Sequence, residues 1–174
     1  DLYLELGLNA SLRSIFYSKK FLNMFSKILK TKKEFVLING FMLRLDAPFD
    51  KRNVLPWHLD ASYYEHTDPF YNAGVCWMPL TNNSFDNGTV RFIPGSNKSK
   101  VNLKNLKYTK KSKLAAGIIE IPVSEEEEKS IKDVNASFGD LGIFHMCLKH
   151  RSGKNISKKF RLTLICRFHD TSKK

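Results

Sequence analysis

The sequence predicts a mainly β domain, an antiparallel sandwich or jelly roll with one helix packed on its outside. Two observations support this class: one segment with helical periodicity comes first, and at least six short segments with strand character follow it. Turn residues separate these segments, which is typical of antiparallel architectures. No internal repeat or linker divides the 174 residues, so we expect a single domain over residues 1–174. Because the chain begins at Asp1, we also expect part of an N-terminal scaffold to be missing.

The helical segment covers residues 11–30. Apolar residues recur there at helical spacing between lysines, and Ser11 is placed to cap the first turn. An apolar stripe between lysines is typical of a helix with one face on the core. We therefore expect this helix to cover a sheet from outside.

The expected strands are rich in β-branched and aromatic residues and are bounded by turn residues. They cover residues 35–38, 41–45, 57–60, 71–80, 89–93, 117–123, 141–149 and 159–168. Asp86-Asn87-Gly88 lies between two of them, which predicts that residues 71–80 and 89–93 form an antiparallel hairpin. Pro94-Gly95-Ser96 predicts a turn after the second of these strands.

The charge and the cysteines exclude several classes of protein. Residues 87–119 hold eight basic residues and no acidic one, so most of the net charge of +12 is local, mainly between Lys98 and Lys113. Nucleic-acid binding is disfavoured because aromatic residues hardly occur in that segment. The cysteines are Cys76, Cys147 and Cys166, widely spaced and odd in number, which argues against a disulfide scaffold. We expect buried thiols in a cytoplasmic protein, and no segment long and apolar enough to span a membrane.

A candidate metal site is indicated by His58-Leu59-Asp60 and by His150. Residues two apart in a strand share a face, so His58 and Asp60 should project together while Leu59 packs on the other side. Two histidines and one carboxylate form the ligand set that holds non-haem Fe(II) and leaves positions open for O₂ and a bidentate ligand. A second His-x-Asp copy, His66-Thr67-Asp68, is the weaker candidate because it lies among polar residues before Pro69.

Arg161 is the candidate anion ligand. It opens an almost continuously apolar strand, and a buried guanidinium requires an anionic partner, which the carboxylate of a co-substrate would supply. Thr163 shares its face and is placed to add a hydrogen bond. We interpret His145 as a packed histidine because its strand parity is opposite to that of His150, and His169 as a solvated one near the C-terminus.

These residues resemble the phytanoyl-CoA dioxygenase-like family of Fe(II)- and 2-oxoglutarate-dependent oxygenases. The matching segments, in the order of the family, are Trp57-His58-Leu59-Asp60 with Tyr63-Tyr64, Asp86-Asn87-Gly88-Thr89-Val90, Ile93-Pro94-Gly95-Ser96, Gly139-Asp140 through Phe144-His145 to His150, Ser152-Gly153-Lys154-Asn155, and Arg161. They span about residues 41–168, most of the chain.

The resemblance implies a double-stranded β-helix, the cupin-like form of the jelly roll. It implies Fe(II) held by His58, Asp60 and His150, and 2-oxoglutarate with its distal carboxylate on Arg161. The implied reaction consumes O₂ and 2-oxoglutarate, releases succinate and CO₂, and hydroxylates a small-molecule substrate. Related halogenases replace the carboxylate ligand by a small residue, so the presence of Asp60 favours hydroxylation.

Two alternatives remain open. The chain could be a non-catalytic jelly-roll binding module whose metal site is structural or vestigial. It could also be a cupin-like metalloenzyme that uses no 2-oxoglutarate; Arg161 argues against this, and His66 is the one loose candidate for a third histidine ligand. The lysines between Lys98 and Lys113 suggest an anionic substrate, with a solvated lysine-rich loop and lysine enrichment from genome base composition as the alternatives.

Overall fold

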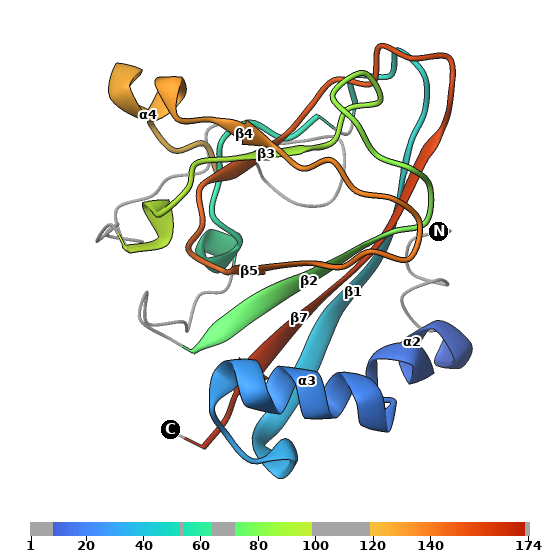
Figure 1. Cartoon of the computed structure of the whole chain (residues 1–174), viewed down its shortest axis with the longest axis vertical. Coiled ribbons are helices and arrows are strands. Elements are labelled where there is room, and N and C mark those ends of the chain that lie inside the picture. The colour runs from blue at the N-terminus through green and yellow to red at the C-terminus, as the bar shows by residue number, and fades with distance from the viewer. Residues whose placement is uncertain (1–8, 53, 64–71, 99–118, 173–174) are drawn as a thin grey trace.

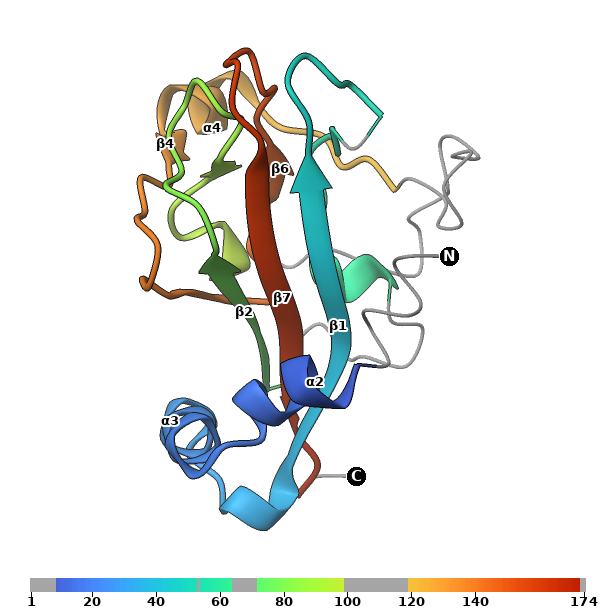
Figure 2. The ribbon, with the colours of Figure 1, turned by 90° about the vertical axis from the view of Figure 1, so that its right-hand side faces the viewer.

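The structure, a computed structural model, describes residues 9–52, 54–63, 72–98 and 119–172. Two antiparallel sheets form its framework (Figures 1 and 2). The main sheet has the order β1-β7-β2-β5, with β1 at Val36–Asp46, β7 at Arg161–Asp170, β2 at Ala73–Pro79 and β5 at Gly142–His145. The small sheet has the order β4-β3-β6, with β4 at Lys132–Asp133, β3 at Val90–Phe92 and β6 at His150–Ser152. The prediction of a mainly β antiparallel fold is confirmed.

The N-terminal helical segment is two helices, α2 (Ala10–Phe16) and α3 (Lys19–Leu29), so the prediction of one helix capped by Ser11 is wrong. Each helix has its own cap, because Asn9 accepts a hydrogen bond from the Leu12 amide and Ser18 accepts one from the Phe21 amide. The Tyr17 hydroxyl donates to the Ile38 carbonyl at 2.9 Å and ties the corner between the helices to β1. Both helices lie across one end of the main sheet, near the C-terminus, as expected for an outer layer (Figure 1).

The remaining helices among the described residues are short. They are the 3₁₀ turns η1 (Lys33–Phe35), η2 (Asp60–Tyr63) and η3 (Ser96–Lys98), and the helix α4 (Glu125–Lys129). The acidic run that begins at Glu125 forms α4, which starts with a capping box between Ser124 and Glu127. None of the described helices is long and apolar enough to cross a membrane.

Several strand predictions need correction. Residues 35–38 and 41–45 are one strand, β1, with an irregularity between Asn39 and Met42 that Gly40 permits through its positive φ of 59°. Residues 71–80 and 89–93 are not a hairpin, because β2 belongs to the main sheet and β3 to the small one. Residues 141–149 are not one strand: β5 ends at His145, a turn follows, and β6 begins at His150 in the other sheet. Within residues 119–123 no strand is assigned.

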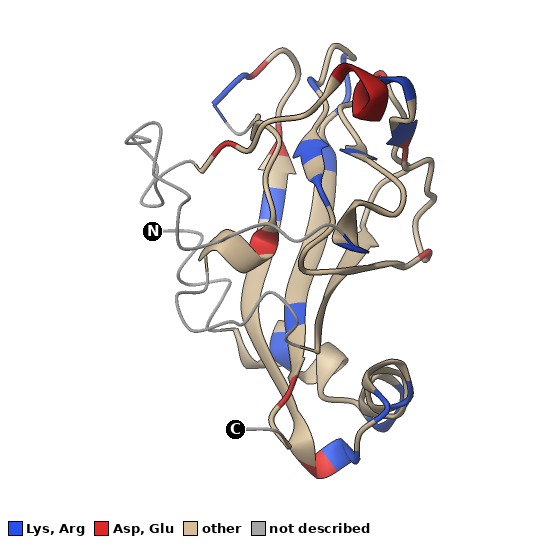
Figure 3. Ribbon diagram, turned by 90° about the vertical axis from the view of Figure 1, so that its left-hand side faces the viewer, with Lys and Arg blue, Asp and Glu red and all other residues tan. Residues whose placement is uncertain are grey.

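The main sheet has an apolar face and a mixed face. On β7, alternate residues Leu164, Cys166 and Phe168 pack with α2 and α3, where the Phe25 and Phe168 rings stack at 4.2 Å. The opposite face of β7 carries Arg161, Thr163, Ile165, Arg167 and His169. Figure 3 marks the Lys and Arg positions along the ribbon in blue, including those on the long strands of the main sheet. This mixed face forms one wall of the candidate site.

The three cysteines and two of the histidines test the sequence predictions. Cys76, Cys147 and Cys166 are buried thiols, as predicted. His145 is partly buried and its Nδ1 accepts from the Cys147 amide, in agreement with a packing role. The interpretation of His169 as solvated is wrong: it is 4% exposed on β7, and its Nε2 lies 3.0 Å from Asn39 Oδ1.

Burial of His169 predicts a pH-dependent stability. Burial, aided by the charge of Arg167, lowers the pKa of His169 from its usual 6.5 to about 4. As the pH falls below 6.5 the unfolded chain therefore binds a proton that the folded protein takes up only near pH 4. The contribution of neutral His169 to the free energy of unfolding is complete above pH 6.5 and is lost as the pH falls from 6.5 to 4. Its size is up to about 3 kcal/mol. Urea unfolding of wild type and of His169→Gln between pH 4 and 7 should show a shallower pH dependence in the variant; parallel curves would contradict this.

Candidate metal centre

His58 and His150 are brought together by the backbone. The His58 amide donates to the His150 carbonyl at 2.9 Å, and the His150 amide donates to the His58 carbonyl at 3.1 Å. Residues that exchange both hydrogen bonds lie directly opposite each other and present their side chains on the same side. The ring centroids are accordingly 4.2 Å apart. The small sheet thus places the two imidazoles as neighbours.

Asp60 lies beside the two histidines because of a turn, and not because of the expected strand. Residues 57–60 are not a strand, since His58 forms an isolated bridge and Asp60 opens η2. The turn is anchored by the Ala61 amide, which donates to the Met146 carbonyl at 3.1 Å. Leu59 points away from the metal candidates into an apolar cluster and is fully buried, as predicted.

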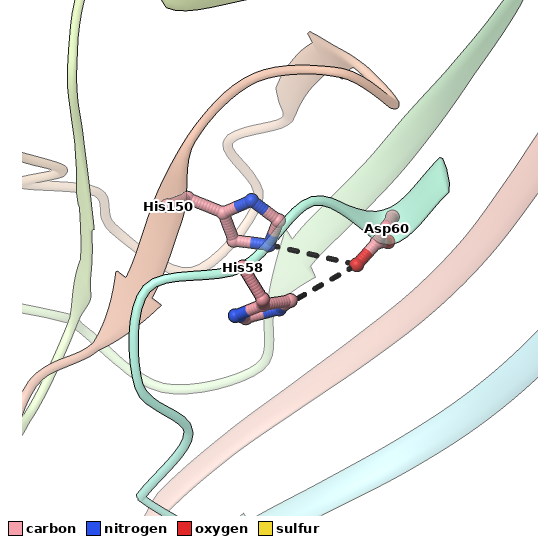
Figure 4. A group of neighbouring side chains, drawn as sticks. All are labelled: His58, Asp60 and His150. Carbon is pink, nitrogen blue, oxygen red and sulfur yellow. Dashed lines mark ion pairs between the residues drawn. The ribbon is translucent and has the colours of Figure 1, made fainter. Parts of the chain in front are cut away.

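The three side chains converge in the protein interior (Figure 4). Asp60 Oδ1 lies 3.6 Å from Nε2 of His58 and 3.6 Å from Nε2 of His150. The candidate ligand atoms of the three residues all lie within 4.8 Å of one another, and each residue is at most 7% exposed. In the described part of the chain this is the one such cluster of His, Cys, Asp or Glu.

The protonation of the triad suits a cation. His58 Nδ1 lies 2.8 Å from the Pro56 carbonyl and His150 Nδ1 lies 2.9 Å from the Leu148 carbonyl. A carbonyl only accepts, so each Nδ1 carries a proton, and a ring in its neutral form presents the Nε2 lone pair toward Asp60. Burial lowers the pKa of His150 to about 4, which keeps this ring neutral at pH 7.

Asp60 is ionised at neutral pH. Burial disfavours the charge, but the positive charge of Arg167, which donates to Oδ2, favours the carboxylate, and the pKa of the carboxyl lies far below its usual range. With both rings in the neutral form that binds a metal, two imidazole lone pairs and a carboxylate oxygen meet with no hydrogen-bond donor between them. Such a set of acceptors is stable around a positive ion, and two neutral imidazoles with one carboxylate fit a divalent metal of the non-haem iron type.

Arg161 and Thr163 lie on the same face of β7, as predicted. Arg161 is 1% exposed, and its Nη2 donates to Asp46 Oδ2 at 2.6 Å. Its Nε and Nη1 and the Thr163 hydroxyl are buried without a hydrogen-bond partner. Unpaired buried donors are costly, so three of them side by side on one strand indicate a ligand with acceptor atoms.

Two further charged residues, Asp46 and Arg44, lie beside Arg161, and sequence reasoning missed both. Arg44 donates to both carboxylate oxygens of Asp46 at 2.9–3.0 Å, and Asp46 pairs with Arg161 across β1 and β7. The internal anion that a buried Arg161 requires is therefore Asp46, yet two of the guanidinium nitrogens remain unpaired. Alternation on β1 was the available signal, since Arg44 and Asp46 share a face.

The remaining family-like segments are structural supports. The segments around Gly88 and Gly153 approach so closely that a Cβ on either glycine would lie under 3 Å from backbone of the other segment. Asn155, 3% exposed, donates to the carbonyls of Asp46 and Lys159 and so fixes the ends of β1 and β7 beside Arg161. Ser96 accepts from the Lys149 amide at 2.9 Å, immediately before His150.

Two sequence-based candidates lie outside the described residues. They are the second His-x-Asp copy, His66 and Asp68, and nearly all of the basic segment between Lys98 and Lys113. Arg167, in contrast, is a functional candidate that sequence reasoning did not identify. It lies six residues after Arg161 on the same face of β7, and its Nε donates to Asp60 Oδ2 at 3.0 Å.

Solved structures share this architecture. EvdO2 from Micromonospora carbonacea var. aurantiaca, in complex with 2-oxoglutarate, superposes with a TM-score of 0.74 at 16% identity over 92% of this chain and 63% of its own. EctD from S. alaskensis, with 2-oxoglutarate and 5-hydroxyectoine, gives 0.72 at 18% identity over 97% of this chain and 55% of its own. SnoN, a non-haem α-ketoglutarate-dependent epimerase from nogalamycin biosynthesis, gives 0.69 at 16% identity over 93% and 57%. The chain thus spans less than two thirds of each, and the double-stranded β-helix predicted from the resemblance is confirmed.

Sequence comparison identifies the family. A search of curated proteins gave no significant match. The model of the phytanoyl-CoA dioxygenase family matches residues 6–163, which include the whole metal triad and Arg161. With its buried His58–Asp60–His150 cluster and this match over most of its length, the chain belongs to the phytanoyl-CoA dioxygenase family.

Proposed function

We propose that this protein is a hydroxylase that uses Fe(II), 2-oxoglutarate and O₂ to oxidise a small-molecule substrate. Fe(II) and 2-oxoglutarate are typical of the family, and the triad that would hold the metal is in place. The observation that carries the proposal is the presence of two buried sets: three convergent acceptors at His58, Asp60 and His150, and unpaired donors at Arg161, which lines the same pocket, and at Thr163.

The triad would bind the metal through Nε2 of His58, Nε2 of His150 and Oδ1 of Asp60. Two histidines and one carboxylate leave three metal positions for exogenous ligands. When bound, iron with 2-oxoglutarate and O₂ supplies the oxidation that transfers one oxygen atom to a C–H bond of the substrate and releases succinate and CO₂. The Pro56 and Leu148 carbonyls hold the Nδ1 protons, so that both rings keep the orientation that metal binding needs.

Arg161 and Thr163 would bind the distal carboxylate of 2-oxoglutarate. The Arg161 guanidinium offers Nε and Nη1, and the Thr163 hydroxyl offers a further donor. Four arginines line this pocket, Arg44, Arg151, Arg161 and Arg167, and the described carboxylates that pair with them there are Asp46 and Asp60. The arginines outnumber these carboxylates, so a carboxylate ligand would offset part of the excess positive charge.

Apolar side chains would exclude water from the reaction. Val75, Trp77 and Ile165 line the pocket beside the triad, and Phe144 lies 4.9 Å from the His150 ring. The Tyr63 ring meets His58 edge-on at 6.0 Å. A dry site strengthens the electrostatic contacts of the co-substrate and protects reactive species from side reactions.

The substrate class and the location are proposed from the sequence and from the cysteines. The basic segment between Lys98 and Lys113 favours an anionic small molecule, and the three buried cysteine thiols favour a cytoplasmic protein. The alternative, a non-catalytic binding module, is tested together with catalysis. The purified protein with Fe(II), O₂ and 2-oxoglutarate should release succinate slowly even without substrate. A protein that binds metal but never forms succinate, with any candidate substrate, would favour the binding module.

Thr163→Val separates co-substrate binding from folding. The Thr163 hydroxyl is buried without a partner, so its replacement by a methyl group of the same shape should leave the melting temperature unchanged or raise it. The lost hydrogen bond to the carboxylate should raise the Kd for 2-oxoglutarate about 10-fold, the equivalent of about 1.4 kcal/mol. Calorimetry on the Mn(II)-loaded protein and thermal unfolding of the metal-free protein check the two expectations. A clear loss of stability with unchanged 2-oxoglutarate affinity would show that the hydroxyl serves the fold.

A further inference from the structure

Arg167 connects the metal candidates to the main sheet. Its Nε donates to Asp60 Oδ2 at 3.0 Å, and its Nη1 donates to the Gly40 carbonyl at 2.9 Å. The Gly40 carbonyl is available because β1 is irregular between Asn39 and Met42, where Gly40 has a positive φ. The guanidinium is mostly buried, with its side chain 14% exposed, so its position is fixed at both ends.

The two oxygens of Asp60 are in different environments. Oδ1 faces both histidine Nε2 atoms at 3.6 Å, whereas Oδ2 faces Arg167. In the described part of the chain, the hydrogen bond that Oδ2 accepts comes from Arg167 Nε. An oxygen that accepts a charge-assisted hydrogen bond and faces a positive guanidinium is a poor ligand for a metal ion.

We propose that Arg167 is a positioning residue that keeps Asp60 a one-oxygen ligand and so preserves the third open metal position. The proposal rests on the metal site of the proposed function. A carboxylate on a hard divalent ion can bind through one oxygen or through both. Two-oxygen binding by Asp60 would fill one of the three positions that a bidentate co-substrate and O₂ together require.

The geometry requires more than a positive charge. The planar guanidinium spans two acceptors, Asp60 Oδ2 and the Gly40 carbonyl, with separate nitrogens. Lysine could donate to Oδ2 but cannot fix both acceptors with one planar group, and methionine keeps only the apolar stem. Arg167→Lys keeps a donor to Oδ2, whereas Arg167→Met keeps only the apolar bulk of the side chain. Comparison of the two variants therefore separates the effect of the hydrogen bond from the effect of bulk.

Water proton relaxation of Mn(II) tests the proposal directly, because it counts exchangeable waters on the bound ion. With Mn(II) saturated by protein and without 2-oxoglutarate, the wild type should retain three waters. Arg167→Met should retain two, a fall of about one third in relaxivity per bound ion. It should still bind Mn(II), since the carboxylate gains a second bond to the metal, but its Kd for 2-oxoglutarate should rise by at least about 10-fold. Arg167→Lys should restore most of the wild-type relaxivity.

Matched controls separate this effect from a general loss of packing. Arg91 forms an ion pair with Asp133 at 2.6 Å on the small sheet and pairs in register with Arg151 and not with a residue of the triad, so Arg91→Met removes an arginine–aspartate pair without touching Asp60. It should leave relaxivity unchanged. Arg161→Met should weaken 2-oxoglutarate binding but keep three waters on Mn(II).

The possible outcomes are distinct. Wild-type relaxivity in folded Arg167→Met would overturn the positioning role. Absence of Mn(II) binding by the wild type would instead overturn the proposed function. If Arg167→Met does not fold, a crystal structure of the Mn(II)-loaded wild type decides: one Asp60 oxygen on the metal supports the proposal, and two oxygens contradict it.

Discussion

His150→Ala is expected to raise the Kd for Mn(II) by more than about 100-fold, beyond the loss seen when a residue that merely supports a ligand is changed. The imidazole is one of three ligands, and alanine offers no donor atom in its place. Because His150 holds the bridge to His58 through its backbone, the fold should persist. Succinate formation with Fe(II) should fall to the background rate.

The control for this variant is His145→Gln. His145 is five residues away, on β5, and its Nδ1 accepts a hydrogen bond from the Cys147 amide. It is not part of the triad, so Mn(II) affinity should stay within a few-fold of wild type. Calorimetric titration of Mn(II) into both variants makes the comparison. Equal Mn(II) affinities in His150→Ala and His145→Gln would show that the metal is bound elsewhere.

Arg161→Met should have the second-largest effect, on 2-oxoglutarate rather than on the metal. Loss of a buried charged partner costs about 2 kcal/mol or more, so the Kd for 2-oxoglutarate should rise by roughly 30-fold or more. The Kd for Mn(II) should change little, because Arg161 contacts Asp46 and no residue of the triad. Stability should also fall, since Asp46 keeps Arg44 but loses its partner on β7.

Titration of 2-oxoglutarate into the Mn(II)-loaded variant measures this effect, with Arg91→Met as the matched arginine control. Arg161→Met that binds 2-oxoglutarate as tightly as the wild type would refute the assignment of the distal carboxylate to Arg161. Thr163 and Arg161 share a strand face and a ligand in this account, so the double variant should show less than the sum of the two single effects.

Local sequence patterns predicted the parts of the site that depend on strand alternation. Arg161 and Thr163 share a face because β7 is a regular ten-residue strand. Residue type and family-like order predicted that His58, Asp60 and His150 converge, which the structure shows, but the reason given for His58 and Asp60 was wrong. They converge through a bridge and a 3₁₀ turn, which tertiary hydrogen bonds to His150 and Met146 impose.

What the sequence did not reveal depends on pairing between distant strands. The Asp46–Arg161 pair joins residues 115 positions apart, and the Arg167–Asp60 pair joins residues 107 positions apart. Local periodicity carries no information about which strands become neighbours. The same limit explains the wrong hairpin, because residues 80–89 pass between sheets instead of closing one. The helix break at Tyr17 and Ser18, in contrast, had a local signal in the capping serine.

The most direct test of the central claim is the binding of 2-oxoglutarate to the wild-type protein with and without Mn(II). The account predicts one 2-oxoglutarate site that depends on the metal, because the triad supplies one end of the site and Arg161 with Thr163 the other. Binding should disappear in His150→Ala and weaken strongly in Arg161→Met. Metal-independent binding of 2-oxoglutarate, or none at saturating Mn(II), would contradict the assignment of this site.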